Sequence, residues 1–413
     1  MSIMESYLKM KDPTHIMKFE FSEDLFGPAE VKNPGIERFS SAEKIGEMLK
    51  ETIKKDPHFY LFSPDETTSN KLEKAYDVTE RAWALPTKSW DMPESESGRI
   101  VELLSENTLF AAMVGHVLEG EQAMMTSYES FFSIITSQVL QYIKFLSQSE
   151  MVSWRAPVPA INLLSTSTCW RQDHNGFSHQ SPMLISTLLA NPSNRVNCLF
   201  PVDDVAAARA YKFMYHSNNV VNLATFNKSE EPRFIDRNHA EFQYEHGASV
   251  FGFCSDEDPD YIFTAAGDIV TREAIAAIEI LKRDIPGRRF RFVGINALSY
   301  RAIGTTDEKM NHEKFNEYFT DNKPIIANFH GYADALRTIL VNYANQDRLS
   351  VHGFEEHGST TTPFEMLRLN HASRYDLAID IAAREGREDL VAKYSSLLQD
   401  NARYAREYGE DML

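Results

Sequence analysis

Cysteine, basic clusters and long apolar runs are scarce in this sequence, and each shortage excludes a class of protein. The three cysteines, Cys169, Cys198 and Cys254, are an odd number without CxxC spacing, which excludes a zinc ribbon and a disulfide framework. Reduced thiols are typical of the cytoplasm, so we expect a cytoplasmic protein. The most apolar stretch, residues 130–146, is interrupted by polar side chains, and the amino terminus lacks the apolar core of a signal peptide. We therefore expect no association with a membrane.

Clusters of positively charged residues are also scarce. The formal net charge is -18, and the densest basic run is GRRFRF at residues 287–292. Nucleic acid is excluded as a partner, because binding it needs a concentrated basic face. The chain also lacks a P-loop and a GxGxxG fingerprint, the glycine-rich motifs that bind nucleotide phosphates.

The 413 residues do contain an alternating strand and helix pattern that is long enough for two domains. We expect an amino-terminal arm over residues 1–35, a first domain over 36–232 and a second domain over 233–413. The predicted helices include 41–55, 70–83 and 374–413, and the strands predicted in the second domain are 261–266, 289–295, 324–329 and 349–354. The alternation predicts an α/β fold of two doubly wound domains with mainly parallel sheets.

Chemically active side chains are densest in WRQDHNGFSHQSP, residues 170–182, between a predicted strand and a predicted helix. Such loops, at the carboxyl ends of strands, are where α/β sheets bind ligands. Asp173, His174 and His179 could ligate a metal, although the spacing puts the histidines on no common helical face. The loop could instead be only a tight turn at 175–176. In a third interpretation both histidines are acid–base or phosphate-contact groups.

Two further positions leave a structural and a functional interpretation open. Glu106 follows a predicted strand at residues 99–104 and is typical of a first helical turn, where an acid interacts favourably with the helix dipole. Phe131 and Phe132 open the apolar helix predicted after Tyr128, and such a pair is more typical of a core than of a cofactor platform.

One motif we interpret as a decoy. Gly267 and Asp268, followed by Asn296, imitate the GDG…N signature that holds magnesium on thiamine diphosphate, but Ile269 replaces the second glycine. The TTTP run at residues 360–363 is typical of a helix cap through Thr361 or Thr362.

Together, eight short motifs resemble the carboxyl-terminal half of phosphoketolases over about residues 37–411. In chain order they are PDETTSN, LLSE, SYE, WRAP, WRQDHNGFSHQ, FHGY, GSTTTPF and YGED. Phosphoketolases use phosphate to split xylulose 5-phosphate, and often fructose 6-phosphate, into acetyl phosphate and a shorter aldose phosphate. The resemblance implies a thiamine diphosphate pyrimidine-binding domain followed by a transketolase-like C-terminal domain.

The resemblance also implies cofactors and partners. The cofactors are thiamine diphosphate and Mg²⁺, with the diphosphate and metal held by another chain. The small-molecule partners are a phosphosugar and inorganic phosphate. We expect a homo-oligomer, or a hetero-oligomer with an amino-terminal phosphoketolase half.

Site residues are carried over from the same motifs. Glu106 resembles the catalytic glutamate that hydrogen-bonds the aminopyrimidine ring, and His174 and His179 resemble the histidines that handle protons during C–C cleavage. Tyr128, with Phe131 or Phe132, resembles the cofactor contacts. The contacts to substrate hydroxyls and phosphate correspond to Ser69, Asn70, Arg155, Gln172, Asn175 and Lys228.

The sequence departs from the family pattern at two places. Glu150 stands five positions before Arg155, where the family has a basic residue, and a carboxylate there would repel phosphate. Ala333 and Asp334 replace the proline and tryptophan that follow FHGY. These departures leave three hypotheses: the catalytic half of a phosphoketolase that works with a separate diphosphate-binding chain, a non-catalytic structural or regulatory relative, and a metal-dependent hydrolase.

Overall fold

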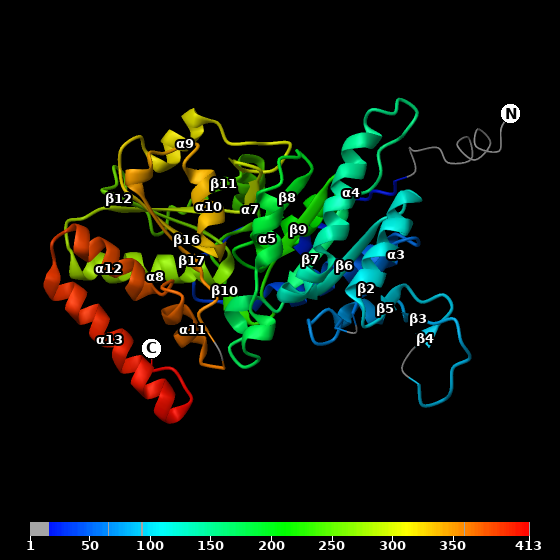
Figure 1. Cartoon of the computed structure of the whole chain (residues 1–413), viewed down its shortest axis with the longest axis horizontal. Helices are drawn as coiled ribbons and strands as arrows, with labels where there is room; N and C mark the ends of the chain where they lie inside the picture. The colour runs from blue at the N-terminus through cyan, green and yellow to red at the C-terminus, as the bar shows by residue number, and fades with distance from the viewer. Residues whose placement is uncertain (1–15, 65, 92–93, 359, 413) are drawn as a thin grey trace.

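The computed structural model describes residues 16–64, 66–91, 94–358 and 360–412. Residues 1–15 of the predicted arm, Asp65 of PDETTSN and Ser359 of GSTTTPF lie outside these ranges. Two large sheets lie side by side, each covered by helices, with α13 (Glu388–Tyr408) along the outer side of the second (Figure 1). Within the described residues, no helix is both apolar enough and long enough to cross a bilayer.

The first sheet has ten strands, and those from β8 to β4 in its order run parallel. Across the sheet they are β15 (Ala302–Ile303), β14 (Ala297–Ser299), β8 (Val196–Leu199), β9 (Val221–Thr225), β7 (Ile161–Thr166), β6 (Ala123–Tyr128), β2 (Tyr60–Ser63), β5 (Ile100–Glu102), β3 (Arg81–Ala82) and β4 (Glu94–Ser95).

Both faces of this sheet are buried, because successive side chains of its strands point into different cores. Met124 and Leu164 pack with α2 (Ser41–Lys55) and α6 (Asp204–His216), whereas Met125 and Leu163 pack with the helices of the other face. Those helices are α3 (Glu106–Leu118), α4 (Thr136–Ser149) and α5 (Met183–Leu189).

The second sheet has five strands, of which only the edge strand β11 (Ala248–Val250) is antiparallel. The others are β13 (Phe290–Ile295), β12 (Tyr261–Ala266), β16 (Ile325–Tyr332) and β17 (Leu349–Phe354). Its helices are α7 (Arg237–His246), α8 (Asp268–Asp284), α9 (His312–Phe319), α10 (Ala333–Leu340), α11 (Pro363–Leu369), α12 (Arg374–Arg384) and α13. A two-stranded ribbon, β1 (Arg38–Ser40) with β10 (Glu230–Pro232), completes the described strands.

The predicted α/β class with two mainly parallel sheets is confirmed. The helix predicted at 70–83 is wrong: the chain forms the 3-10 turn η3 (Glu73–Asp77) and then enters strand β3. The domain boundary at 232/233 stays a prediction, and the structure adds one fact to it. Strands β14 and β15 lie beyond that boundary, yet they return to the first sheet, where β14 pairs with β8.

The predicted threonine cap of α11 is also corrected. Thr362 is the N-cap residue, but its side chain makes no cap hydrogen bond. Instead the Asp411 carboxylate accepts from the Phe364 N–H at 2.7 Å and from the Thr362 hydroxyl at 2.5 Å. The cap comes from the far end of the chain because an ionised carboxylate is a stronger acceptor than a hydroxyl and favours a helix amino terminus.

Candidate active site

The motif residues gather at one edge of the first sheet. Strands β9, β7, β6, β2 and β5 are neighbours and run parallel, so their carboxyl ends meet along one line. The segments that follow these ends are 226–229, 167–182, the 3-10 turn η4 (Glu129–Ile135), 64–72 and the start of α3. Ligands bind at this edge in open α/β sheets.

Glu106 is the first residue of α3, and its side chain turns inward. Ser105 caps the helix by accepting from the Thr108 N–H. Glu106 itself is only 8% exposed, and its Oε1 accepts a hydrogen bond from the Ser127 hydroxyl at 3.3 Å. A solvated first-turn acid would be exposed, so burial favours the functional interpretation of this carboxyl over the helix-dipole one.

Glu66 is a second carboxyl at the same place, and sequence reasoning did not single it out. It accepts the Tyr128 N–H at 3.1 Å. Its pKa is raised to about 7, mainly by burial and also by the charge of Glu106, while the hydrogen bond from Tyr128 and the charge of Lys228 act in the opposite direction. The signal was present in PDETTSN, since this motif follows β2 and β2 neighbours both β5 and β6.

An aromatic group lies beside these carboxyls. The rings of Tyr128 and Phe131 stack with centroids 5.8 Å apart, and the Phe131 ring meets that of His179 edge-on at 5.0 Å. Lys228 lies 5.0 Å from the Tyr128 ring centre and donates to the Ser69 carbonyl at 3.2 Å. Burial lowers the pKa of His179, as does the proximity of His174, which favours the neutral imidazole.

The polar residues of the loop at 170–182, the central loop, are held in place by hydrogen bonds to neighbouring side chains. Gln172 is 1% exposed, and its side-chain oxygen accepts from the Asn175 amide at 2.6 Å. The Ser167 hydroxyl donates to the buried Asn70 side chain at 3.1 Å. The structure therefore brings together most of the predicted site residues: Glu106, Tyr128, Phe131, His179, Ser69, Asn70, Gln172, Asn175 and Lys228.

The other three predicted residues have different surroundings. Phe132 is 1% exposed and lies inside the hydrophobic core. The side chain of His174 is 67% exposed. Arg155 precedes β7 and packs on the Phe145 ring at 4.6 Å, at the opposite edge of the sheet. There Glu150 pairs with Arg195, which offsets its charge.

In the motif that imitates the thiamine diphosphate signature, Asp268 is hydrogen-bonded within the protein. Asp268 is 3% exposed, and its two oxygens accept the backbone N–H groups of Ile269 at 2.7 Å and Asn227 at 3.1 Å. Within the described residues, the Asp173–His174–His179 set forms no metal-like group. Among the described residues, the side chains close enough together to hold a metal ion are those of Glu129, Cys169 and His330.

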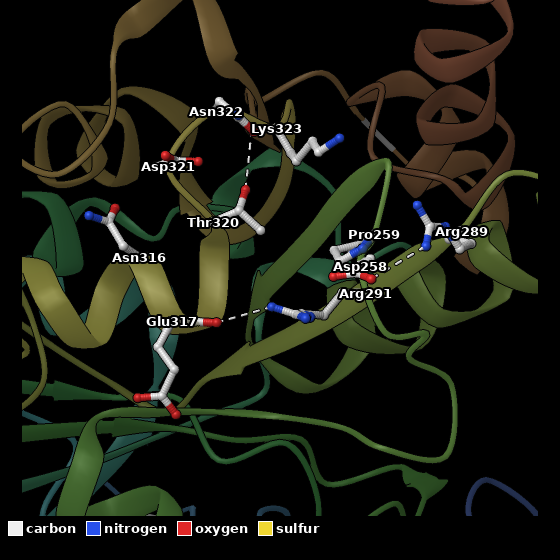
Figure 2. A pocket seen from close by; sticks show the side chains of 10 residues that line it. All are labelled: Asp258, Pro259, Arg289, Arg291, Asn316, Glu317, Thr320, Asp321, Asn322 and Lys323. Atoms are coloured by element: carbon white, nitrogen blue, oxygen red, sulfur yellow. Dashed lines mark hydrogen bonds and ion pairs between the residues drawn. The ribbon is translucent and has the colours of Figure 1, made fainter.

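A pocket of about 580 Å³ lies elsewhere, at the amino ends of β12, β13 and β16 (Figure 2). Arg291 in this pocket donates to the carbonyls of Glu317 and Tyr318, each at 3.0 Å, at the end of α9. The Arg291 guanidinium therefore caps the carboxyl end of α9. The pocket lies at the amino ends of the strands, whereas His330 lies near the carboxyl end of β16.

Comparisons with known proteins agree with this geometry. Residues 43–217 match the family model for D-xylulose 5-phosphate/D-fructose 6-phosphate phosphoketolase, and residues 228–413 match the model for its C-terminal domain. A probable phosphoketolase of Nitrosospira multiformis is 33% identical over 93% of this chain and 49% of its own length. One from Pseudomonas putida is 33% identical over 92% of this chain and 50% of its own. The chain thus spans about half the length of these relatives.

Transketolases are among the similar solved structures. A Pichia stipitis transketolase in complex with sedoheptulose 7-phosphate has a TM-score of 0.67 and 17% identity, covering 91% of this chain and 49% of that chain. A split-gene transketolase, described as an inactive β4 tetramer, has a TM-score of 0.55 and 16% identity, covering 85% of this chain and 99% of that chain. At these identities the likeness shows the fold. The two family models and the curated relatives show that the chain belongs to the phosphoketolase family.

Proposed function

We propose that this chain is the half of a phosphoketolase that carries the catalytic glutamate, and that it works with a separate chain. The reaction would be phosphorolytic cleavage of xylulose 5-phosphate, with fructose 6-phosphate as a second substrate, to acetyl phosphate and an aldose phosphate. The observation that carries the proposal is the buried Glu106 carboxyl beside the stacked Tyr128 and Phe131 rings.

The site residues fit part of thiamine diphosphate, on which phosphoketolases and transketolases depend. A buried carboxyl is a suitable partner for an aminopyrimidine nitrogen, and a flat phenyl ring is a suitable packing surface for the pyrimidine. When bound, the cofactor would supply the carbanion and the electron sink that C–C cleavage needs.

The chain's own residues would divide the remaining work. Glu106 would hold a proton against the pyrimidine nitrogen, and burial of the carboxyl would keep water from competing for that bond. Phe131 and Tyr128 would orient the ring. His179, whose neutral form is favoured by burial, would accept a proton from a substrate hydroxyl, and Lys228 would contact a phosphate.

The diphosphate and Mg²⁺ would be held by the second chain. Asp268 and Asn296 do not support a diphosphate site in this one, since the oxygens of Asp268 already accept two backbone N–H groups. The split-gene transketolase supports a separate half, because this fold covers 99% of that chain.

The test is activity of the reconstituted pair with Glu106→Gln. We expect acetyl phosphate formation to fall at least about a hundredfold, because general acid–base groups contribute about 10²–10⁴ in rate. Glu119→Gln, at the exposed far end of the same helix, is the matched control and should retain activity. Undiminished turnover by Glu106→Gln would reject the catalytic assignment.

A second experiment tests whether a separate partner chain exists. The chain is isolated gently from its own cells, the native mass is determined, and the accompanying polypeptide is identified. We expect a stoichiometric chain that carries GDG and a downstream asparagine. A chain that isolates alone, binds no thiamine diphosphate and supports no turnover would instead be the non-catalytic structural or regulatory relative.

A further inference from the structure

A buried acid–imidazole pair joins the two sheets next to the site. Glu129 opens η4 directly after β6 of the first sheet, and His330 lies near the carboxyl end of β16 in the second. Their side chains are 3% and 1% exposed, and His330 Nε2 is hydrogen-bonded to Glu129 Oε1 at 2.8 Å. These residues are 201 positions apart in the chain.

Both members of the pair also hold the start of the central loop. Glu129 Oε2 accepts the Cys169 N–H at 2.6 Å, and the His330 carbonyl accepts the Trp170 indole N–H at 2.8 Å. Trp170 is itself 1% exposed. Cys169 and Trp170 lead directly into the loop that carries Gln172 and His179. Glu129 and His330 therefore each hold the start of this loop by a hydrogen bond.

The second sheet contributes another contact at the same edge. Asp268 begins α8 directly after β12, and its Oδ2 accepts the Asn227 N–H at 3.1 Å, one residue before Lys228. Burial opposes a charge on His330, but the negative charges of Glu129 and Asp268 outweigh it and raise the His330 pKa. The imidazole thus lies between carboxylates that hold two different loops of the site.

Glu129, Cys169 and His330 also resemble a metal site, since their ligand atoms lie within 4.8 Å of one another. The contacts favour hydrogen bonding instead. One oxygen of Glu129 is engaged by His330 and the other by the Cys169 N–H, and burial, together with Glu129, raises the thiol pKa of Cys169 and so keeps the sulfur protonated.

We infer that Glu129 and His330 are positioning residues, through which the second sheet holds the 169–180 loop in the geometry the site requires. The inference rests on the proposed function for the catalytic meaning of the loop. The contacts themselves do not depend on that function.

The test compares two imidazole–carboxylate pairs on adjacent strands of the second sheet by hydrogen exchange of the whole chain. His330→Asn removes the pair at the site. His352→Asn is the matched control, because His352 on β17 bonds Asp380 at 2.9 Å and the His371 carbonyl at 2.7 Å, contacts that involve no loop of the first sheet. We expect the amides of residues 169–180 to exchange at least about tenfold faster in His330→Asn, and to keep wild-type protection in His352→Asn.

Two milder variants keep the test decisive where His330→Asn fails to fold. Glu129→Gln retains an acceptor for the Cys169 N–H, and Trp170→Phe removes only the indole bond to His330. Each should raise exchange in the same segment. Wild-type loop protection in folded variants, equal loss of protection in His352→Asn, or a stoichiometric metal ion in the purified chain would overturn the inference.

Activity separates this inference from the proposed function. In the reconstituted pair we expect His330→Asn to lower kcat more than it raises KM, because a displaced loop misplaces reacting groups. A wild-type pair without activity, combined with faster loop exchange in His330→Asn, would reject the proposed function and leave the positioning role in place.

Discussion

Among single residues of the site, Glu66 is a partly buried carboxyl with a raised pKa. Its carboxyl accepts the Tyr128 N–H and faces the charge of Glu106. Removing it from water favours the neutral form, and the pKa rises from 4.5 to about 7. Carboxyls with a raised pKa are common in acid–base sites, so Glu66 is a further candidate for proton handling beside Glu106.

Glu66 should also make stability depend on pH. Between pH 4.5 and about pH 7 the folded chain binds more protons at Glu66 than the unfolded chain, so the free energy of unfolding falls as pH rises through this window. Glu66→Gln mimics the neutral carboxyl and lacks this loss. Its stability relative to wild type should therefore rise across the window by up to about 3 kcal/mol.

Urea unfolding at several pH values measures that difference. Glu73→Gln, which removes an exposed carboxylate in the neighbouring turn η3, is the control. A difference between Glu66→Gln and wild type that stays constant with pH would show that Glu66 ionises as readily in the folded chain as in the unfolded one.

At the scale of elements, the junction of β12 and α8 is a tight turn next to the site. Gly267 has φ +122°, and a Cβ on it would lie 2.8 Å from the His330 Cβ and 3.1 Å from a Val270 methyl. The turn lets Asp268 begin α8 directly after the strand. Glycine is needed here both for its backbone conformation and for the close approach of β16.

Gly267→Ala should therefore destabilise the chain by about 2–3 kcal/mol, because the variant adds a strained φ and a steric overlap. Gly115→Ala is the control, since Gly115 lies within α3 and a Cβ there meets nothing within 4 Å. It should be neutral or stabilise by up to about 1 kcal/mol. Thermal or urea unfolding measures both, and equal stabilities of the two variants would contradict the role of the turn.

At the scale of the whole molecule, the two sheets share chain segments as well as contacts. Strand β14 follows β13 of the second sheet, yet it pairs with β8 through Ala297↔Leu199 and Leu298↔Cys198. All four residues of β8 are buried. Without β14, this apolar strand would be an unprotected edge, which is a template for association with another chain.

A fragment of residues 16–232 should therefore fail to behave as an independent domain. We expect it to aggregate or to lose its cooperative unfolding transition, whereas the whole chain unfolds cooperatively. Size-exclusion chromatography and circular dichroism during urea unfolding measure this. A monomeric fragment with a sharp transition would show that β14 and β15 are dispensable for the first sheet.

Local pattern determined much of this fold. The strands 261–266 and 349–354 and the helix 41–55 were predicted with the bounds the structure has, because continuous apolar runs and a helical period are properties of short windows. The helix predicted at 70–83 failed since a weak pattern there yielded to long-range packing around Ala75 and Leu72. The edge on which Glu106, Tyr128 and His179 meet followed from β/α alternation, which puts the loops after parallel strands on one side.

Only the tertiary structure decided which of these residues touch. Glu66 beside Glu106, Glu129 on His330, and β14 against β8 all join segments far apart in sequence. The same long-range contacts separated Phe131 at the site from Phe132 in the core. Such pairings depend on how two sheets pack, and hydrophobic period and turn chemistry carry no information about that, because they describe an element and not its neighbour.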